Sequence, residues 1–330
     1  MLFIDFKDGC SAQELNVKET NMPVLKPGQV LVKVAAFGIN RADTLQRQGK
    51  YPAPAGESPI LGLEISGEVF EVSTLPEVGA DNDSWQRGDK VFGLVAGGAY
   101  AEYVAVDASH LIRVPKNITL TEAAGLAEVF LTAFQSMFQV ADLQAKQKVL
   151  IHAGASGVGL AAIQLAKVKG CMVAVTASND LKLQKCAELG ADLLINYQQQ
   201  DFVQCIKQSW QGCDLVIDFV AGDYLNRNLQ VLNMDGSIVN LAMLSGRFVK
   251  QLDMGLVLGK RANIMGSTLR SRSDNYKQNL IVHFKKQFMH MFDTAELLPT
   301  IDTVYEADQV SVAHQRIEDN DTMGKLICCW

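Results

Sequence analysis

Residues 149–159 read Val-Leu-Ile-His-Ala-Gly-Ala-Ser-Gly-Val-Gly, a short apolar run that passes directly into a glycine-rich turn. The run predicts a buried strand, and apolar residues at helical spacing from Val158 to Val168 predict a helix after the turn. A strand, a tight turn and a helix in this order present unpaired backbone N–H groups and the positive end of a helix dipole to an anion. We therefore expect a dinucleotide pyrophosphate at this turn. The residues expected to hold it are Ser156, Gly157, Val158 and Gly159.

Ser156 makes the turn a variant of the pattern Gly-x-Gly-x-x-Gly, because it stands at the middle glycine. A hydroxyl at that position could donate a hydrogen bond to a phosphate oxygen. The alternative is an ordinary tight turn that binds nothing. The pattern of strands and helices on both sides favours the dinucleotide.

Further apolar runs follow the turn at regular intervals. They cover residues 172–177, 193–197, 215–220, 238–241 and 264–267, and helical patterns lie between them at residues 181–189, 202–209 and 224–232. Buried strands that alternate with helices predict an α/β fold, a doubly wound parallel sheet of the Rossmann type.

The first 110 or so residues have a different hydrophobic pattern. Apolar runs at residues 30–34, 65–72, 91–94 and 101–106 are bounded by glycine and proline, which predicts an antiparallel β domain. Thr119 and Glu122 match a capping box, and a long apolar helix is expected over residues 123–140. The tail, with a helix at 276–292 and an apolar end at 325–330, is too small for a domain and is expected to fold back onto the first. The predicted domains are residues 1–120 with 270–330, and residues 121–269.

Composition narrows the classes of function. The chain has 330 residues, 48% of them hydrophobic and 20% charged, with a net charge of −6 and no Lys/Arg cluster. This is typical of a soluble globular protein and argues against nucleic acid as the principal partner. The most apolar stretch, residues 123–140, contains Glu128 and Gln135, so we expect no membrane span. Seven scattered cysteines, no Cys-x-x-Cys pair and no signal sequence predict a cytoplasmic protein without structural disulfides.

The end of the second strand of the α/β region bears on which nicotinamide cofactor is used. Enzymes that use NAD place an acidic residue there, against the ribose 2′-hydroxyl. This chain has Ser178 at the expected end, and Lys182 and Lys185 on the next helix supply positive charge for a 2′-phosphate, which favours NADPH. Asp180 could read the hydroxyl of NADH if the strand ended later. Its alternative role, which we favour, is the N-cap of a helix that begins at Leu181.

Several motifs resemble the medium-chain dehydrogenase/reductase superfamily, and within it the zinc-independent quinone oxidoreductases. They lie at residues 38–43, 46–51, 61–64, 98–104 and 152–159. Residues 40–51 and 269–272 are most similar to the tumour-suppressor-inducible quinone oxidoreductases of vertebrates. The resemblance implies that the β-rich domain is a GroES-like catalytic domain beside the Rossmann domain.

Two zinc ligands of the related alcohol dehydrogenases are missing. Their motif Gly-His-Glu reads Gly62-Leu63-Glu64 here, and residues 39–42, ahead of Asp43, include no cysteine. A catalytic zinc needs three protein ligands, so we expect no metal. The five histidines share no helical spacing and are interpreted as structural or surface residues. They are His110, His152, His283, His290 and His314.

The resemblance also implies a set of site residues. Those of the catalytic cleft are Asn40, Asp43, Gln48 and Tyr51. Those of the cofactor, beyond the turn, are Lys182 and Tyr197 at the 2′-phosphate and Leu241, Met243, Ser267 and Leu269 along the nicotinamide. Tyr51 could stack on a ring or give a proton to a developing quinol oxygen, while Asn40 could orient a ligand through its amide. The alternatives are packing beside prolines for Tyr51 and helix capping for Asn40 and Asp43.

An acceptor that no metal polarises must already be electrophilic, and a quinone meets this requirement. The chain is therefore expected to be an NADPH-dependent quinone reductase that passes a hydride to quinones. Ortho-quinones are the expected substrate class. Two alternatives stay open: a reductase of enal or enone C=C bonds, and an NADPH-binding sensor or structural protein with little turnover. By resemblance we also expect a homodimer joined through edge strands. Residues 238–241 and 249–258 are apolar enough to serve, and equally apolar enough to belong to the core.

Overall fold

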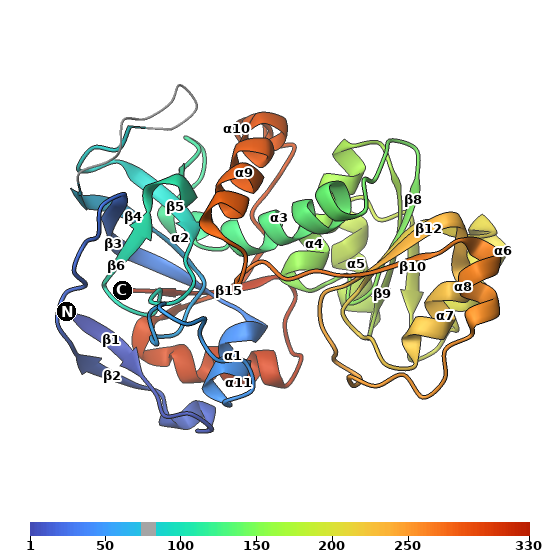
Figure 1. Cartoon of the computed structure of the whole chain (residues 1–330), viewed down its shortest axis with the longest axis horizontal. Coiled ribbons are helices and arrows are strands. Elements are labelled where there is room, and N and C mark those ends of the chain that lie inside the picture. The colour runs from blue at the N-terminus through green and yellow to red at the C-terminus, as the bar shows by residue number, and fades with distance from the viewer. Residues whose placement is uncertain (74–83) are drawn as a thin grey trace. The chain divides into compact units, whose positions relative to one another are not determined.

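The computed structural model describes residues 1–73 and 84–330 (Figure 1). The chain divides into two compact units. One consists of Met1–Leu131 with Leu269–Trp330, and the other of Thr132–Thr268. The predicted domain boundaries at 120/121 and 269/270 stay a prediction.

The unit Thr132–Thr268 is built on a six-stranded parallel sheet. Its strand order is β10 (Leu193–Asn196), β9 (Met172–Ala177), β8 (Lys148–Ile151), β11 (Cys213–Asp218), β12 (Leu232–Asn240) and β13 (Asn263–Gly266). The chain moves outward from β8 to one edge and then returns to build the other side. The order therefore reverses between β8 and β11, which is the arrangement of a doubly wound sheet. The predicted fold class is confirmed for this unit.

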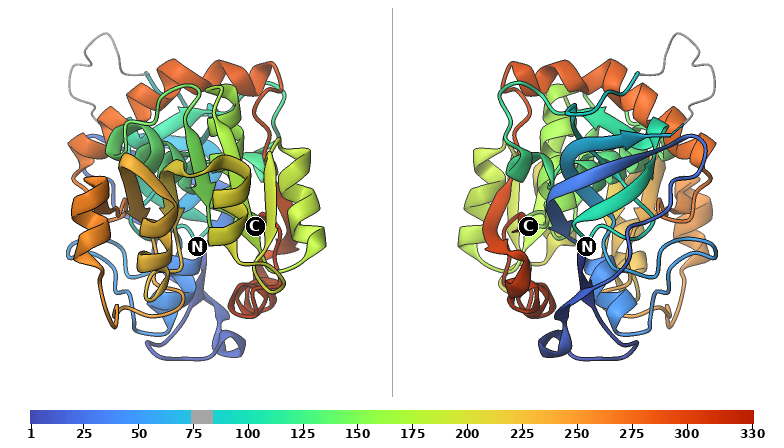
Figure 2. Two further views of the ribbon diagram at one scale, coloured as in Figure 1. Left: turned by 90° about the vertical axis from the view of Figure 1, so that its right-hand side faces the viewer. Right: turned by 90° about the vertical axis from the view of Figure 1, so that its left-hand side faces the viewer.

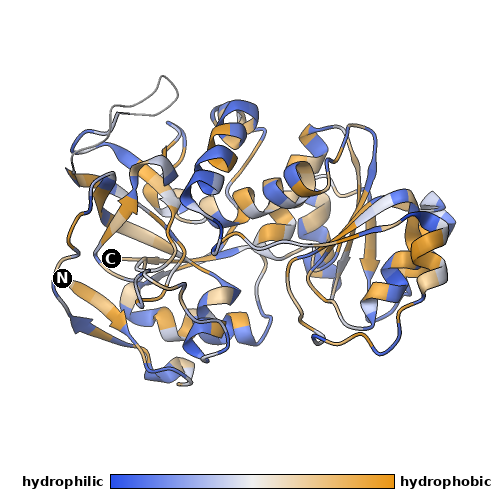
Figure 3. Cartoon of the chain, in the orientation of Figure 1, coloured by the Kyte–Doolittle hydropathy of each residue, from blue (hydrophilic) through white to orange (hydrophobic). Residues whose placement is uncertain are grey.

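Helices cover both faces of this sheet (Figure 2). They are α4 (Gly157–Val168), α5 (Asp180–Glu188), α6 (Phe202–Trp210), α7 (Tyr224–Val231) and α8 (Met254–Lys260). Side chains of α6, α7 and α8 pack with strand residues such as Leu150 and Ile238 in one apolar cluster. Because the central strands are buried on both faces, they are hydrophobic along most of their length (Figure 3).

Neither of the two segments considered for the sheet edge lies there, and for residues 238–241 the alternative of a core position is confirmed. Residues 238–241 fall at the end of β12, which lies between β11 and β13. Residues 249–258 contain the start of helix α8 rather than a strand. The edges are β10 and β13, and Ile264 of β13 is 39% exposed. An apolar run alone does not distinguish a central strand from an edge strand, because both carry β-branched residues.

The other unit holds a seven-stranded sheet, antiparallel except for one pair. The strand order is β14 (Ile301–Glu306), β15 (Lys325–Cys329), β3 (Gln29–Ile39), β4 (Glu64–Val72), β5 (Lys90–Leu94) and β7 (Leu111–Arg113), and β6 (Tyr103–Asp107) also pairs with β3. A separate pair is formed by β1 (Leu2–Asp5) and β2 (Asn16–Glu19). Strand β15 pairs antiparallel with β3, so the tail folds back onto the first part of the chain as predicted.

The helix expected over residues 123–140 is broken. The capping box is present, since the Glu122 carboxylate accepts from the Thr119 N–H at 2.8 Å and the Thr119 hydroxyl accepts from the Glu122 N–H at 3.2 Å. The helix it starts, α2 (Leu120–Ala123), is short, and α3 (Ala127–Phe134) begins after Gly125 and continues as a π-helix over Gln135–Val140. A Cβ on Gly125 would contact Ile301 and Ile327 at 3.0 and 3.1 Å, so the break lets the chain pass close to the tail strands.

The helices of the first unit that matter for the site are α1 (Arg41–Arg47) and α11 (Val310–Glu318). The tail helix at 276–292 is present as α9 (Asp274–Phe284), a π-helical turn over Lys285–Met289 and α10 (His290–Asp293). Within residues 1–73 and 84–330, no helix has the length and apolarity needed to cross a membrane. All seven cysteines are free thiols, and five of them are buried.

Candidate functional site

The glycine turn after β8 brings backbone atoms unusually close together. Ser156 caps α4, and its hydroxyl oxygen accepts from the Gly159 N–H at 3.1 Å. A Cβ on Gly159 would lie 2.5 Å from the carbonyl oxygen of Gly154, so only glycine allows the helix to start this close to the turn. The Ser156 hydroxyl keeps its single hydrogen for another acceptor. The turn therefore has the geometry expected of an anion site at a helix N-terminus.

A buried chain of polar side chains lies directly behind this turn. His152 contacts the Thr176 hydroxyl through Nδ1 at 2.9 Å and the Asn228 amide oxygen through Nε2 at 2.8 Å. The Asn228 amide nitrogen donates to Asp218 at 3.0 Å. This direction requires a hydrogen on Nε2 of His152, and burial lowers the pKa of the imidazole, so the ring is neutral. His152 thus has the structural role predicted for it, tying β8, β9 and β11 together.

The end of β9 corrects one prediction. Helix α5 begins at Asp180, and its cap is Asn179, whose side chain accepts from the Lys182 N–H at 2.9 Å. Asp180 is therefore not the N-cap, because the helix starts one residue earlier than expected. Its carboxylate instead accepts from the Asn196 amide of β10 at 3.0 Å.

Ser178 and Tyr197 follow neighbouring strands. The Tyr197 N–H donates to the Ala177 carbonyl oxygen at 3.2 Å, and its side chain is exposed. Ser178 and Lys182 are half-buried, one directly after β9 and one on the first turn of α5. The structure thus gathers the predicted 2′-phosphate residues around the ends of β9 and β10.

The remaining predicted cofactor residues of this unit follow β12 and β13. The Leu241 N–H donates to the backbone carbonyl oxygen of Asp218 at 2.8 Å, and the Met243 side chain is exposed. The Ser267 N–H donates to Asn240 at 3.0 Å, while its buried hydroxyl oxygen has no hydrogen-bond partner. All these residues lie at the carboxyl ends of the parallel strands, where ligands of open α/β sheets bind.

In the first unit, Asn40 and Asp43 build the start of α1. Asp43 accepts from the Asn40 N–H at 2.8 Å. The Asn40 amide oxygen accepts from Lys325 at 2.8 Å, and its nitrogen donates to Glu64 at 3.1 Å and to Gly38 at 3.4 Å. Lys325 and Glu64 form a buried ion pair at 2.5 Å. The Asn40 amide is thus engaged by Lys325, Glu64 and Gly38 within the protein, and it makes no side-chain capping hydrogen bond of its own.

Asp43 is fully buried at one end of a polar chain. One of its oxygens accepts from the Tyr100 hydroxyl at 3.1 Å, and the other has no hydrogen-bond partner. Tyr100 contacts His314 at 2.9 Å, and His314 contacts Arg47 at 3.3 Å. Burial raises the pKa of the Asp43 carboxyl to about 6 and lowers the pKa of His314 to about 3. Capping and packing account for Asp43 without a ligand.

Gln48 is tied to α11. Its amide nitrogen donates to Glu318 at 2.8 Å, and its oxygen accepts from Lys50 at 2.9 Å. Arg47 also pairs with Glu318. Of the four predicted catalytic residues, three therefore belong to hydrogen-bond networks that hold α1, and Tyr51 is the exception.

The Tyr51 ring is half-buried and faces a guanidinium. The centre of the Arg270 guanidinium lies 5.5 Å from the ring centroid. Arg270 is itself anchored, since it donates to Ala96 at 2.8 Å and to Gln46 at 2.7 Å. Leu269, the last of the predicted cofactor residues, is buried next to it in the chain. Sequence reasoning missed Arg270 and Gln46, although Arg270 lies in the run 269–272 that carries part of the family resemblance.

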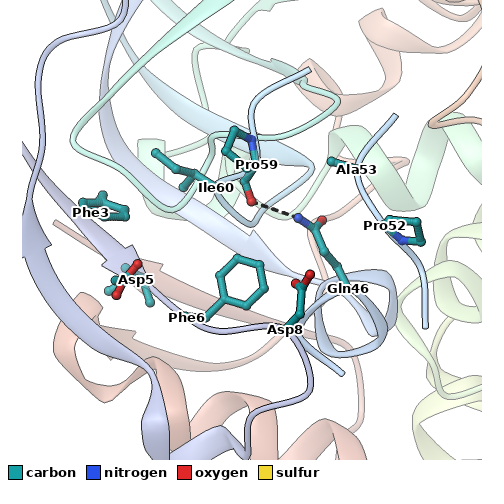
Figure 4. A pocket seen from close by; sticks show the side chains of 10 residues that line it. Phe3, Asp5, Phe6, Asp8, Gln46, Pro52, Ala53, Pro59 and Ile60 are labelled. Atoms are coloured by element: carbon teal, nitrogen blue, oxygen red, sulfur yellow. Dashed lines mark hydrogen bonds between the residues drawn. The ribbon is translucent and has the colours of Figure 1, made fainter. Parts of the chain in front are cut away.

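A cavity of about 400 Å³ opens beside this group (Figure 4). Its walls are mostly apolar, and its polar lining residues are Asp5, Asp8 and Gln46, whose amide donates to the Pro59 carbonyl oxygen at 3.0 Å. The apolar lining residues are Phe3, Ile4, Phe6, Pro52, Ala53, Pro59 and Ile60. Its volume is within the range of small-molecule sites.

In the part of the chain that the structure describes, no group of three or more His, Cys, Asp or Glu side chains could hold a metal ion. Leu63 is buried. Among the histidines, His110, His152 and His314 are buried, while His283 and His290 are exposed. These are the structural and surface positions predicted.

Comparisons with known proteins cover both units. Residues 26–116 match the alcohol dehydrogenase GroES-like domain, and residues 157–285 match the zinc-binding dehydrogenase family. The chain is 31% identical to a quinone oxidoreductase-like protein 2 homolog of Nematostella vectensis, over 92% of this chain and 82% of the relative. It is 27% identical to human quinone oxidoreductase, over 93% and 90%. The crystal structure of Escherichia coli quinone oxidoreductase complexed with NADPH has a TM-score of 0.86, at 25% identity and full coverage of both chains.

Proposed function

The chain belongs to the medium-chain dehydrogenase/reductase superfamily, among its quinone oxidoreductase-like proteins, and from this premise we propose that it reduces quinones with NADPH and without a metal. It is an oxidoreductase of that superfamily, and NADPH is its cofactor. The finer proposal is a preference for ortho-quinones and a place beside the tumour-suppressor-inducible quinone oxidoreductases. The similarity of residues 40–51 and 269–272 supports that place.

The observation that carries the proposal is the set of residues at the carboxyl ends of the parallel strands. The N–H groups of Gly157 and Val158 and the hydroxyl of Ser156 would hold the pyrophosphate, while Ser178, Lys182 and Tyr197 would surround the 2′-phosphate. When bound, NADPH supplies the hydride. Ser178 stands where an enzyme specific for NAD has a carboxylate, and the carboxylate of Asp180 is bonded to Asn196.

Tyr51 is the residue we assign to the substrate. Burial raises the pKa of its hydroxyl, so the phenol carries its proton at neutral pH and can donate it. A quinone oxygen that gains electrons becomes basic and is a suitable acceptor for that proton. Because Leu63 replaces the histidine ligand of the zinc enzymes, the acceptor has to be electrophilic without a Lewis acid.

Turnover of a matched set of acceptors tests the proposal. The purified protein is given NADPH with 1,2-naphthoquinone, with a 2-alkenal, or with neither, and NADPH oxidation is followed by absorbance. Faster turnover of the quinone supports the proposal. Faster turnover of the alkenal supports the C=C reductase instead, and tight NADPH binding with negligible turnover of both supports a sensor.

We further propose a cytoplasmic homodimer. Strand β13 is an edge of the parallel sheet, and the exposed side chains of Ile264 and Leu258 lie on β13 and on the adjoining helix α8. A second copy could continue the sheet there. Light scattering on wild type and Ile264→Lys tests this, because only the interface variant of a dimer should shift toward the monomer mass. Seven free thiols support the cytoplasmic location.

A further inference from the structure

Arg270 is a buried cation without a carboxylate partner. The residue is only 8% exposed, and among residues 1–73 and 84–330 no carboxylate lies within ion-pair distance of it. Two of its nitrogens donate to neutral oxygens, of Ala96 and of Gln46. The third, Nη1, is buried and has no hydrogen-bond partner. Burying a guanidinium without a carboxylate partner lowers the free energy of unfolding. The presence of Arg270 here therefore calls for an explanation other than stability.

The group that faces this cation is an aromatic ring. The guanidinium lies over Tyr51 at 5.5 Å from the ring centroid, close enough for attraction between the cation and the negative face of the ring. The two anchoring hydrogen bonds fix the plane and position of the guanidinium, because its donors form a rigid fork. Arg270 therefore restricts the ring from one side.

We propose that Arg270 is a positioning residue for Tyr51: it holds the phenol ring in place and stabilises the negative charge that the phenol oxygen gains while its proton moves to the substrate. This inference rests on the proposed function, since it assigns Tyr51 the role of proton donor. Arg270 need not touch the substrate to act in this way.

The proton transfer balances as follows. The quinone is reduced by taking up a hydride, two electrons with one hydrogen, for which a C–H bond of NADPH breaks and NADP⁺ is left. The O–H bond of Tyr51 breaks, and a new O–H bond forms on an oxygen of the reduced quinone. Tyr51 then recovers a proton from water, so one proton is consumed from solvent in each turnover.

Charges around Tyr51 act in opposite directions. Burial raises the pKa of the hydroxyl, Arg270 lowers it, and Glu128 raises it. The phenolate would be still less accessible if Arg270 were absent, and proton donation would be slower. The positive charge and its fixed location are both needed, because electrostatic stabilisation depends on preorganised groups.

The test compares Arg270→Met, Arg270→Lys and a matched control, Arg272→Met. Arg272 lies on the same segment and stacks over another tyrosine, Tyr276, at 4.6 Å. The phenol of Tyr51 is titrated by NMR with ¹³Cζ-labelled tyrosine, and Tyr51→Phe assigns its signal. Steady-state kinetics with NADPH and 1,2-naphthoquinone are measured in parallel.

In Arg270→Met we expect the Tyr51 titration to move to higher pH and kcat to fall by about tenfold, with KM for NADPH unchanged. Arg270→Lys should recover part of both effects, and Arg272→Met should show neither. In a Tyr51→Phe background, Arg270→Met should lower kcat no further. If Arg270→Met does not fold, Arg270→Lys and Gln46→Ala, which loosens one anchor, give the same readouts.

The inference is overturned if the pKa of Tyr51 is the same in the Arg270 variants as in the wild type. It is also overturned if Arg270→Met lowers kcat by the same factor in the wild-type and in the Tyr51→Phe background. The titration does not depend on turnover. A wild-type protein that reduces no quinone therefore refutes the proposed function separately, whatever the titration shows.

Discussion

The buried carboxyl of Asp43 gives the sharpest prediction of stability. Burial is the main reason why its pKa is raised from 3.8 to about 6, against the opposing effects of the Asn40 N–H and of Lys325. We expect Asp43→Asn to remove this titration, because an amide carries no ionisable proton. The amide oxygen can still accept from Asn40 and Tyr100, so the fold of α1 should persist.

The proton that binds Asp43 links the free energy of unfolding to pH. A raised pKa means that the folded protein holds the proton more tightly than the unfolded chain, so the contribution is present in full below pH 3.8 and is lost as the pH rises through about 6. The full difference corresponds to about 3 kcal/mol. Between pH 5 and pH 8 the wild type should lose about 1 kcal/mol of unfolding free energy relative to Asp43→Asn.

Urea denaturation at several pH values measures this difference. A Trp210→Phe background leaves Trp85 and Trp330, which both belong to the unit that contains Asp43, so their fluorescence reports that unit. Asp308→Asn, an exposed carboxylate of the same unit, is the control. If the free energies of wild type and Asp43→Asn stay parallel from pH 5 to pH 8, the buried carboxyl is not perturbed as described.

Four further predictions concern the site. Tyr51→Phe should lower kcat for quinones by about 100-fold with little change in NADPH affinity, as measured by kinetics and nucleotide fluorescence. Lys182→Ala should weaken NADPH binding by about 1.5–3 kcal/mol and leave NADH binding unchanged, whereas equal losses in paired titrations would make the lysine purely structural. Gly159→Ala should lower stability by about 1–3 kcal/mol and weaken NADPH, because its Cβ would lie 2.5 Å from a carbonyl oxygen. Dialysis against a chelator should leave quinone turnover unchanged, and a loss restored by added zinc would disprove the metal-free reaction.

Local signals predicted the parallel sheet well. Each strand of that unit is a compact apolar run, and the turn at Ser156 is specified by neighbouring residues. The local sequence was therefore enough to predict these elements. Strand β14 had no such signal, because its residues are only partly buried and it is held by parallel pairing with β15. The break at Gly125 was hidden for a similar reason. It depends on Ile301 and Ile327, which are far away in the sequence.

The roles of the candidate catalytic residues also depend on contacts with residues that are distant in the sequence. Asn40, Asp43 and Gln48 were selected from a motif, and a motif does not reveal whether its polar groups face a ligand or each other. Their partners, Lys325, Tyr100 and Glu318, come from distant parts of the chain. They engage the side chains of Asn40 and Gln48 and one oxygen of Asp43, whose other oxygen has no hydrogen-bond partner.

The pairing of Arg270 with Tyr51 shows why burial has to be known before charge can be interpreted. Arg270 donates to a residue 224 positions away in the sequence, and as a sequence feature it resembles the exposed Arg272. Both stack on a tyrosine, at 5.5 and 4.6 Å, so aromatic contact alone does not separate them. Solvent screens a charge at the surface, whereas a buried charge is screened much less and acts more strongly on its neighbour. Only the buried arginine can therefore influence proton transfer from the phenol that it faces.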